Sequence, residues 1–397
     1  MDLSFSPADQ AFRRDVRAWL GDNLSGEFGA LRGLGGPGRE DEAHDERLAW
    51  NRHLARHGWT ALGWPREHGG RGLSLMRQVI FHEEYARADA PARVNHLGEE
   101  LLGPTLLAFG TEAQKARFLP KIVAAEELWC QGYSEPGAGS DLAGVTTRAH
   151  LEGDEWVVDG QKVWTSMAQV AQWCFVLART EPGTRRHGGL SFLLVPLDQE
   201  GVEVRPIRQI TGGAEFNEVF FSGARTDADL VVGEPGDGWR VATGLLGFER
   251  GVSTLGQQVG FARELDDLVA LAKRNGAIED PVLRDRLAQA KVGLEVIRLN
   301  ALRGLSGLTR GADSADGGGA ASIGKLLWAG WHRRLGELAM QVVGPRSLTA
   351  EGSPYDLDRW QRLYLFSRAD TIYGGSDEIQ RNILAERVLG LPREARP

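Results

Sequence analysis

The sequence predicts an α+β protein, in which a β domain lies between two helical regions along the chain. Apolar residues recur at helical spacing through the first third of the chain, which is typical of amphipathic helices. From about Leu128 the chain changes to short runs rich in Val, Trp and Phe that are separated by turn residues, as expected for an antiparallel β domain. After Pro235-Gly236-Asp237-Gly238 the long helical pattern returns. We therefore predict a helical N-terminal domain, a middle β domain and a C-terminal helical domain, over residues 1–126, 127–235 and 236–397.

The N-terminal domain begins with the signals of a helix start. Ser6 suits the N-cap position, Pro7 suits the first helical position, and Asp9 lies near the positive end of the helix dipole. Further helices are expected over residues 45–58, 74–87 and 111–125. The intervening residues 26–45 are rich in Gly and charge and show no periodicity, so we expect a mobile loop there.

The middle domain is expected from its short apolar runs, which are residues 148–151, 155–158, 162–164, 173–178, 190–196, 202–207 and 218–221. Asp159-Gly160 stands between two of these runs and predicts a hairpin turn, because a type I′ turn needs positive φ. The C-terminal domain is expected to hold long helices over residues 238–274, 281–309, 320–343 and 376–389. Residues 311–319 are low in complexity and are expected to form a loose connector.

Composition excludes several functional classes. The 397 residues carry a formal net charge of −8, and the basic residues are interleaved with acidic ones, so no basic face for nucleic acid is expected. No apolar run approaches the ~20 residues that span a bilayer. Cys130 and Cys174 are the only cysteines, which argues against a disulfide framework or a zinc site. The first residues lack a basic and an apolar signal region, so we expect a cytoplasmic, reducing setting.

Two motif matches are rejected on context. Residues 33–38 match G-x-G-x-x-G, but no strand precedes them and a Pro interrupts them, whereas a dinucleotide site needs a strand, a turn and a helix. Residues 319–325 match most of a phosphate-binding loop, but Leu326 stands where a Ser or Thr is needed. Nucleotide-triphosphate chemistry is therefore not expected.

The most informative stretch is 129–141, Trp-Cys-Gln-Gly-Tyr-Ser-Glu-Pro-Gly-Ala-Gly-Ser-Asp, which ends an apolar run in a Gly-rich loop. Gly137 and Gly139 carry no Cβ, so the backbone N–H groups there can approach a ligand closely. Residues 161–166, Gln-Lys-Val-Trp-Thr-Ser, follow about two dozen residues later and add an indole and further hydroxyls. Taken alone, the loop is equally well explained as an ordinary surface turn.

Together these motifs resemble the flavin-binding face of the acyl-CoA dehydrogenase family. The tail 371–390, which contains Ile-Tyr-Gly-Gly-Ser-Asp-Glu-Ile-Gln-Arg, resembles that family's C-terminal signature, and the resemblance runs in order from Phe5 to Pro392. It implies a middle domain like an antiparallel β-barrel, a C-terminal four-helix bundle and FAD as the cofactor. The implied reaction removes an α-proton from an acyl-CoA thioester and passes the β-hydrogen to flavin N5, giving the trans-2-enoyl thioester.

The resemblance also implies the cofactor contacts. Tyr133, Ser134 and Trp164 would flank the flavin ring, Ser166 would bond near N5, and Gly139 and Ser140 would lie near the ring or the pyrophosphate. Gln341 and Gly344 match the segment that reaches the adenylate half from a neighbouring subunit, and Ser376 and Glu378 match the segment that grips the pyrophosphate and ribose. For Trp164, filling of the core within a strand is the alternative.

The catalytic base is expected at Glu249. One branch of the family carries a Glu in the tail motif, but here that position is Gly374. In branched-chain and long-chain members the Glu precedes an Arg on a bundle helix, which Glu249-Arg250 matches. A carboxylate on an apolar helix face, with small neighbours that leave room for a ligand, would have a raised pKa and accept a proton well. A buried Glu paired with Arg to fix the bundle is the alternative.

Three residues are expected at the substrate. The Gly374 N–H would hold the thioester oxygen together with a flavin ribityl hydroxyl, Tyr373 precedes it in the same motif, and Arg250 would support the site electrostatically or form a plain salt bridge. Many family members also carry Arg-x-x-Phe-Gly on a bundle helix, which contacts the adenosine across a subunit interface. Here Arg274 keeps the charge, but the Phe and the second Gly are missing. We therefore expect a tetramer, with identical or different chains.

The leading hypothesis is thus an FAD-dependent acyl-CoA dehydrogenase that passes its electrons to an electron-transfer flavoprotein. A flavin oxidase or monooxygenase of the same fold is one alternative, and a partner subunit that lends FAD contacts to an active chain is another. The acyl group stays open among branched, long and ring-bearing groups, on CoA or on a carrier protein.

Overall fold

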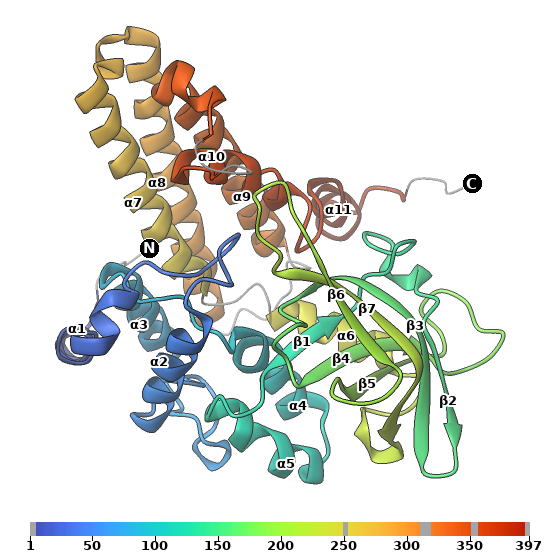
Figure 1. Ribbon diagram of the computed structural model, residues 1–397. Helices are drawn as coiled ribbons and strands as arrows, with labels where there is room; N and C mark the ends of the chain where they lie inside the picture. Colours follow the sequence, from blue (N-terminus) through green and yellow to red (C-terminus); the bar gives the residue numbers. More distant parts are fainter. Residues whose placement is uncertain (1–4, 249–252, 310–318, 351–355, 394–397) are drawn as a thin grey trace. The chain divides into compact units, whose positions relative to one another are not determined.

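The computed structural model describes residues 5–248, 253–309, 319–350 and 356–393, and the chain divides into two compact units. The sheet unit comprises Leu24–Ser74 and Ala90–Gly251. The bundle unit comprises Met1–Asn23, Leu75–Asp89 and Val252–Pro397. Each unit is described by itself, and Figure 1 labels their helices and strands.

The sheet unit is built on one eight-stranded sheet in the order β6-β7-β3-β2-β4-β5-β8, with β1 paired to β4. The strands are β1 (Trp129–Gly132), β2 (Arg148–Glu152), β3 (Glu155–Ser166), β4 (Trp173–Arg179), β5 (Leu190–Pro196), β6 (Val202–Ile207), β7 (Phe216–Asp227) and β8 (Val231–Val232). Most pairs are antiparallel, as the sequence predicts, but β1 runs parallel to β4.

Alternation along the central strands supplies two separate cores. In β4, Phe175 and Leu177 face one cluster while Cys174 and Val176 face the other, because successive side chains point to opposite faces of a sheet. The first cluster also contains apolar residues of α4 (Gly103–Phe109), α5 (Glu112–Val123) and α6 (Gly238–Phe248). These helices therefore cover one face of the sheet.

The hairpin predicted at Asp159-Gly160 is wrong. These residues lie inside β3, where the register shifts between Val158 and Asp159, and Gly160 has φ +151°. A Cβ on Gly160 would meet Thr147, so glycine is needed there for a close approach and not for a turn. The turn lies instead at Gly153, whose φ is +64°, between the paired residues Glu152 and Glu155.

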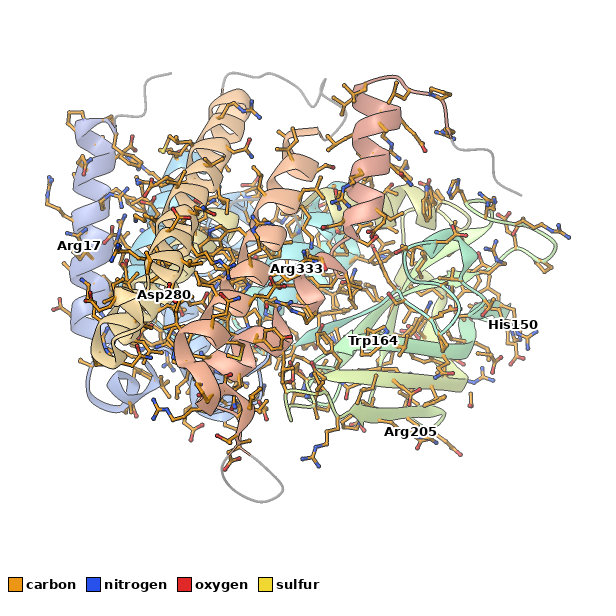
Figure 2. The ribbon with its side chains drawn as sticks, turned by 90° about the horizontal axis from the view of Figure 1, so that it is seen from above. Arg17, His150, Trp164, Arg205, Asp280 and Arg333 are labelled. Carbon is orange, nitrogen blue, oxygen red and sulfur yellow. The ribbon has the colours of Figure 1, made fainter. Side chains whose placement is uncertain are left out.

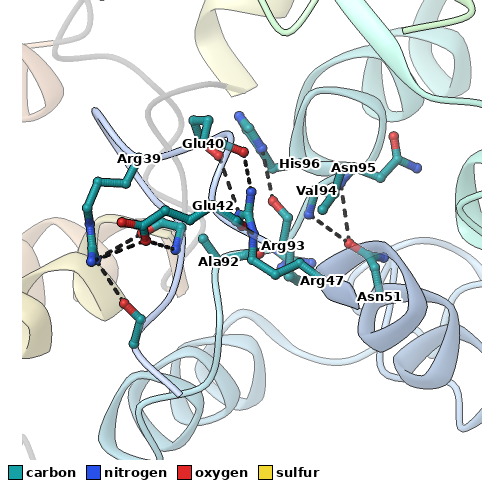
Figure 3. Close-up of polar contacts among 12 residues, drawn as sticks. Arg39, Glu40, Glu42, Arg47, Asn51, Ala92, Arg93, Val94, Asn95 and His96 are labelled. Atoms are coloured by element: carbon teal, nitrogen blue, oxygen red, sulfur yellow. Dashed lines mark hydrogen bonds and ion pairs between the residues drawn. The ribbon is translucent and has the colours of Figure 1, made fainter. Parts of the chain in front are cut away.

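The Gly-rich residues 26–45, expected as a mobile loop, fold around a buried arginine (Figure 3). The Arg47 side chain is fully buried and donates hydrogen bonds to the backbone oxygens of Glu42 at 2.8 Å, Ala92 at 3.1 Å and Glu40. A buried guanidinium needs its five N–H donors satisfied, so the loop wraps it with carbonyl groups. The other helices of this unit are η1 (Gly26–Leu31), α2 (His44–Arg56), η2 (Arg66–His68), η3 (Leu97–Leu102), η4 (Leu142–Gly144) and η5 (Ala228–Leu230).

The bundle unit is helical throughout its described part. Its elements are α1 (Pro7–Asn23), α3 (Leu75–Arg87), α7 (Ser253–Asn275), η6 (Ala277–Glu279), α8 (Pro281–Thr309), α9 (Gly319–Val343), η7 (Gly344–Leu348), α10 (Arg359–Phe366), η8 (Ala369–Thr371), α11 (Asp377–Ile383) and η9 (Leu384–Val388). Long α7, α8 and α9 lie side by side in Figure 1 and share one core with α10, which includes Leu268, Leu294, Leu335 and Trp360. Among the described residues, no helix is long and apolar enough to cross a bilayer.

Candidate functional site

The Gly-rich loop and the end of β3, which the sequence predicts as one site, are adjacent in the sheet unit. The Val163 N–H donates a hydrogen bond to the Ser134 carbonyl oxygen at 2.9 Å. Tyr133 is buried, and Ser134 beside it is half-buried. This bond joins the segment of Tyr133 and Ser134 to the segment of Trp164 and Ser166, although the chain between them spans all of β2.

A buried ion pair holds the Gly-rich loop against β3. Lys162 Nζ donates to Glu135 Oε1 at 2.8 Å, to the Leu177 carbonyl at 2.7 Å and to the Tyr133 carbonyl at 3.1 Å. The second Glu135 oxygen accepts from the Thr146 N–H and hydroxyl. Burial by itself raises the pKa of Glu135, but the Lys162 charge and these hydrogen bonds outweigh it and lower that pKa to about 2. The carboxylate is thus ionised, and its partners hold Glu135 in one position.

Trp164 projects from a bulge at the end of β3. The register of the β3–β7 pair shifts between Lys162 and Thr165, and Trp164 has φ +59°. A bulky residue in the left-handed region is strained, so surrounding contacts must impose this conformation. The side chain is 58% exposed (Figure 2), with its edge towards Phe216 at a centroid distance of 6.2 Å. Filling of the core, the alternative for Trp164, is therefore excluded.

The residues after Trp164 are held by the neighbouring strand. Thr165 pairs with Asn217, whose side-chain amide donates to the Thr165 carbonyl at 3.0 Å. The Met167 N–H donates to the Glu215 carbonyl at 2.8 Å. Ser166 lies between these two anchors and is half-buried, so its backbone is held in place beside the bulge.

The loop itself leaves space that a cofactor can fill. Glu135 and Ala138 exchange backbone hydrogen bonds of 2.9 and 3.0 Å, which closes a tight turn. Gly137 and Gly139 are exposed, neither has positive φ, and a Cβ on either would meet nothing within 4 Å. The fold itself therefore does not require glycine at these positions. A ligand that lies directly against the backbone would require it, because any Cβ would occupy the space of the ligand. Together with an exposed, strained indole, this surface fits a flat aromatic ring with a polar chain.

The predicted adenylate segment lies at one end of the bundle unit. The Asn275 side chain at the end of α7 donates to the Val342 carbonyl near the end of α9, at 2.7 Å. Arg274 and Gln341, which precede these two residues, are both exposed, and Gly344 follows with φ +71°. Gln341 also lines a cavity of about 540 Å³, together with Met340, Leu348, Leu357, Gln361 and Tyr364. Arg274, Gln341 and Gly344 thus lie at the same end of the helices.

The tail motif forms a tight turn that leads into α11. Gly374 and Gly375 have φ +61° and +86°, a conformation that glycine adopts without strain. Ser376 is the N-cap of α11 and accepts from the Ile379 N–H at 3.4 Å. Glu378 lies exposed in the first turn, where its own backbone N–H and the Ser376 hydroxyl lower its pKa. Ser376 and Glu378 thus lie together at the start of α11.

Tyr373 is 38% exposed, and its hydroxyl donates to Asp370 Oδ1 at 2.6 Å. The predicted base, Glu249, and its neighbour Arg250 lie outside the described residues, between α6 and α7.

Sequence reasoning missed the residues that support the site from behind. Glu135 lies within the motif used for the prediction but was not assigned a role, and Lys162 and Asn217 were not singled out. A Lys in the interior of an apolar strand is a usable signal, because such a charge must find a carboxylate. No spacing rule indicates which carboxylate it is.

Comparison with known proteins identifies the family. Residues 6–126, 130–224 and 236–389 match the N-terminal, middle and C-terminal domains of acyl-CoA dehydrogenases. The chain is 66% identical over 387 residues to the acyl-CoA dehydrogenase IpdE1 of Mycobacterium tuberculosis, covering 98% of this chain and 99% of that protein.

Two solved structures are similar over their whole length. The Tcur3481-Tcur3483 steroid ACAD is 31% identical with a TM-score of 0.85, and the match covers 99% of this chain and 100% of that one. The ChsE4-ChsE5 complex from Mycobacterium tuberculosis is 32% identical with a TM-score of 0.82, over the same shares. The α+β class and the order of helical, sheet and helical regions are thereby confirmed. The chain belongs to the acyl-CoA dehydrogenase family, whose members use FAD, and is an oxidoreductase that dehydrogenates acyl-CoA thioesters.

Proposed function

We propose that this enzyme is an FAD-dependent dehydrogenase of a bulky, ring-bearing acyl-CoA of the steroid type, with Glu249 as its base. The word "steroid" in the name of one similar structure supports this acyl class over a straight chain. The sequence supports it too, because Gly247 and Gly251 flank the proposed base and leave room for a wide substrate.

When bound, FAD supplies the acceptor for the β-hydride. The remaining steps fall to residues of this chain. Glu249 accepts the α-proton, and the Gly374 N–H donates a hydrogen bond to the thioester oxygen, which makes that proton more acidic. Trp164 and the segment of Tyr133 and Ser134 would hold the flavin ring, and the Trp164 indole would keep water away from it. Ser166 would donate a hydrogen bond to the ring.

The observation that carries the cofactor assignment is the hydrogen bond between Val163 and Ser134, which joins the segment of the exposed Trp164 to the segment that leads into the Gly-rich loop. An intact cofactor face argues against a chain that only lends contacts to another subunit. The proposed base argues against an oxidase or monooxygenase, since reaction of reduced flavin with oxygen does not require it. An electron-transfer flavoprotein is the acceptor that we propose.

We also propose that the enzyme works as a heteromer. Both similar structures carry the names of two different chains. The Arg-x-x-Phe-Gly motif is incomplete at Arg274, so a second chain would supply the adenosine contacts that this one lacks. The outer side of α8 presents Val292, Val296 and Leu299, which are 64%, 47% and 52% exposed at helical spacing. Such an apolar stripe is typical of an assembly surface.

Anaerobic bleaching of the flavin tests the proposal. The chain, purified with its FAD and with any partner that accompanies it, is mixed with straight-chain, branched and steroid-type acyl-CoA esters. We expect the steroid-type ester to reduce the flavin fastest, and air to reoxidise the reduced enzyme slowly. Rapid reoxidation would favour an oxidase, and a stable flavin-free monomer from the chain alone would count against self-assembly.

Glu249→Gln tests the base in the same assay. This variant should stay folded and yellow but should not be bleached by substrate. Glu203→Gln is the matched control, because Glu203 is exposed and forms a surface ion pair with Arg205 at 2.7 Å. Near-normal flavin reduction in Glu249→Gln would remove Glu249 from this role.

A further inference from the structure

The bundle unit contains a buried charged network that the proposed reaction does not use. His332 on α9 is 9% exposed and lies between two carboxylates. Its Nδ1 lies 2.5 Å from Asp370 Oδ2, and its Nε2 lies 3.0 Å from Glu264 Oε2 on α7. Phe261 packs against the imidazole at a centroid distance of 4.5 Å. With an acceptor on each nitrogen, the ring can satisfy both only as the imidazolium, since the neutral form has a single N–H.

The charge of this histidine follows from its surroundings. Burial by itself lowers the pKa of His332, but the hydrogen bonds and charges of Asp370 and Glu264 outweigh it and raise that pKa to about 9. The other charged group at the network is Lys325 on α9, whose ammonium donates to the Asp370 carbonyl and lies 5.0 Å from the centre of the Tyr373 ring. Two cations and two carboxylates therefore balance, and His332 is charged at neutral pH.

Asp370 connects this network to the tail turn. Its side chain is buried, with one oxygen bound to His332 and the other accepting from the Tyr373 hydroxyl at 2.6 Å. Tyr373 is the residue before Gly374. On the far side of the turn, the Gln380 amide donates to the carbonyls of Gly374 and Gly375, both at 3.3 Å. The two glycines are thus held between a phenol on one side and an amide on the other.

A turn of two glycines has little stiffness of its own, because glycine populates many backbone conformations. The direction of the Gly374 N–H must therefore come from the anchors on either side. Gln380 binds carbonyl groups on the α11 side, whereas on the other side the Tyr373 N–H donates to the Ala369 carbonyl at 3.0 Å and the Tyr373 hydroxyl is held by Asp370. Asp370 in turn keeps its position through His332, which α7 holds by means of Glu264.

We propose that His332 is a positioning residue for the reaction, acting through Asp370 and Tyr373 to aim the Gly374 N–H. This inference rests on the proposed function, in which that N–H faces the thioester oxygen. It gives a positioning role to Glu264 and His332, which lie far from the tail motif in sequence but within the same unit of the structure.

Two variants and one control test the inference. His332→Gln keeps a polar side chain of similar length but removes the charge. Tyr373→Phe removes only the hydroxyl, so it leaves the buried charges paired and keeps the test open if His332→Gln folds poorly. His150→Gln is the control, because His150 is exposed on β2 (Figure 2) and bonds to the surface residue Glu152 at 3.1 Å.

Hydrogen exchange of the amides of residues 369–380 gives a readout that needs no substrate. We expect exchange about tenfold faster in His332→Gln and Tyr373→Phe than in wild type, the ratio for loss of one hydrogen bond of typical strength. His150→Gln should exchange like wild type. Unchanged exchange in both network variants would overturn the inference, whatever the substrate is.

Flavin reduction by the acyl-CoA ester gives the second readout. The rate constant should fall about tenfold in both variants while FAD content and KM stay close to wild type, because one donor to the thioester oxygen is misaimed. The double variant should be no slower than the slower single one, since both act through Asp370. Wild type should lose rate as pH rises through about 9, and His332→Gln should not show this loss.

The two proposals fail in different ways. If no ester bleaches wild type while the exchange changes as expected, the proposed function fails and His332 still positions the turn. If exchange rises but the rate constant and its pH profile stay at wild-type values, the turn is positioned for stability alone and the inference is overturned.

Discussion

Lys162 Nζ and Glu135 Oε1 lie 2.8 Å apart in the interior of the sheet unit, directly between the strand that carries Trp164 and the loop that carries Ser134. Both side chains are almost fully buried, with exposures of 0% and 4%. The geometry of the proposed cofactor face thus depends on an ion pair that is almost fully shielded from solvent. Its removal should affect stability and cofactor binding together.

Lys162→Met should destabilise the fold by about 3–5 kcal/mol, because it leaves the Glu135 carboxylate buried without its cation. Retention of FAD through gel filtration should fall as well, since the Tyr133 carbonyl loses its donor. Lys121→Met is the control, because Glu127 keeps its bonds to Arg117 when Lys121 is removed. That change should cost under about 1 kcal/mol. Equal losses in the two variants, measured by urea unfolding, would refute the special role of the buried pair.

Acid should weaken the bundle unit through Glu84. This buried carboxylate on α3 binds Arg13 at 2.7 Å and Arg17 at 2.8 Å on α1, and Arg87 at 2.5 Å. Burial raises its pKa, but the three arginines outweigh that effect and lower the pKa to about 2. A lowered pKa stabilises the fold at neutral pH, and this contribution is lost as pH falls from about 4.5 towards 2.

Glu84→Gln should therefore cost on the order of 3–4 kcal/mol at pH 7, at about 1.4 kcal/mol per pKa unit. The difference from wild type should shrink as pH falls through that range. Unfolding free energies of both proteins across pH 2–7, a range set by the linkage relation, check this. If the difference in unfolding free energy between wild type and Glu84→Gln is the same at every pH, Glu84 stabilises the fold by packing and not by its charge.

Trp164→Ala should leave the fold almost untouched, within about 0.5 kcal/mol, because its indole is 58% exposed and its backbone is strained. FAD retention should fall clearly, and the visible flavin spectrum should shift. Trp156→Ala is the matched control, since Trp156 is only 5% exposed and its removal should cost about 3–5 kcal/mol. A large loss of stability in Trp164→Ala, with FAD binding unaltered, would contradict the cofactor role.

Gly139→Ala should lower the affinity for FAD without lowering the melting temperature of the apoprotein. A Cβ there meets nothing within 4 Å, and φ is not positive, so the protein itself accommodates a methyl group. Gly29→Ala is the control, because a Cβ at Gly29 also meets nothing within 4 Å. Calorimetry gives the melting temperatures of the two apoproteins, and FAD titration gives their affinities. Equal FAD affinity in Gly139→Ala and Gly29→Ala would contradict the role of Gly139 in binding the cofactor.

Local pattern was sufficient for the regular elements. The β5 strand at Leu190–Pro196 and the α8 helix at Pro281–Thr309 lie where the sequence predicts them, because apolar periodicity and Pro at the ends are local signals. The hairpin was misplaced for an equally local reason. Gly160 has positive φ at a bulge inside β3, and a residue in a hairpin turn can have positive φ too. Only the pairing of β3 with β7 shows that Gly160 lies in a bulge and not in a turn.

The sequence by itself determined the class of the fold, the family and the types of side chain at the cofactor face, since motifs and periodicity are properties of neighbouring residues. Tertiary structure alone decided that Lys162 pairs with Glu135, that Trp164 faces outward, and that His332 reaches Tyr373 through Asp370. These contacts join residues from different elements. Their energies depend on burial, which no single stretch of chain contains.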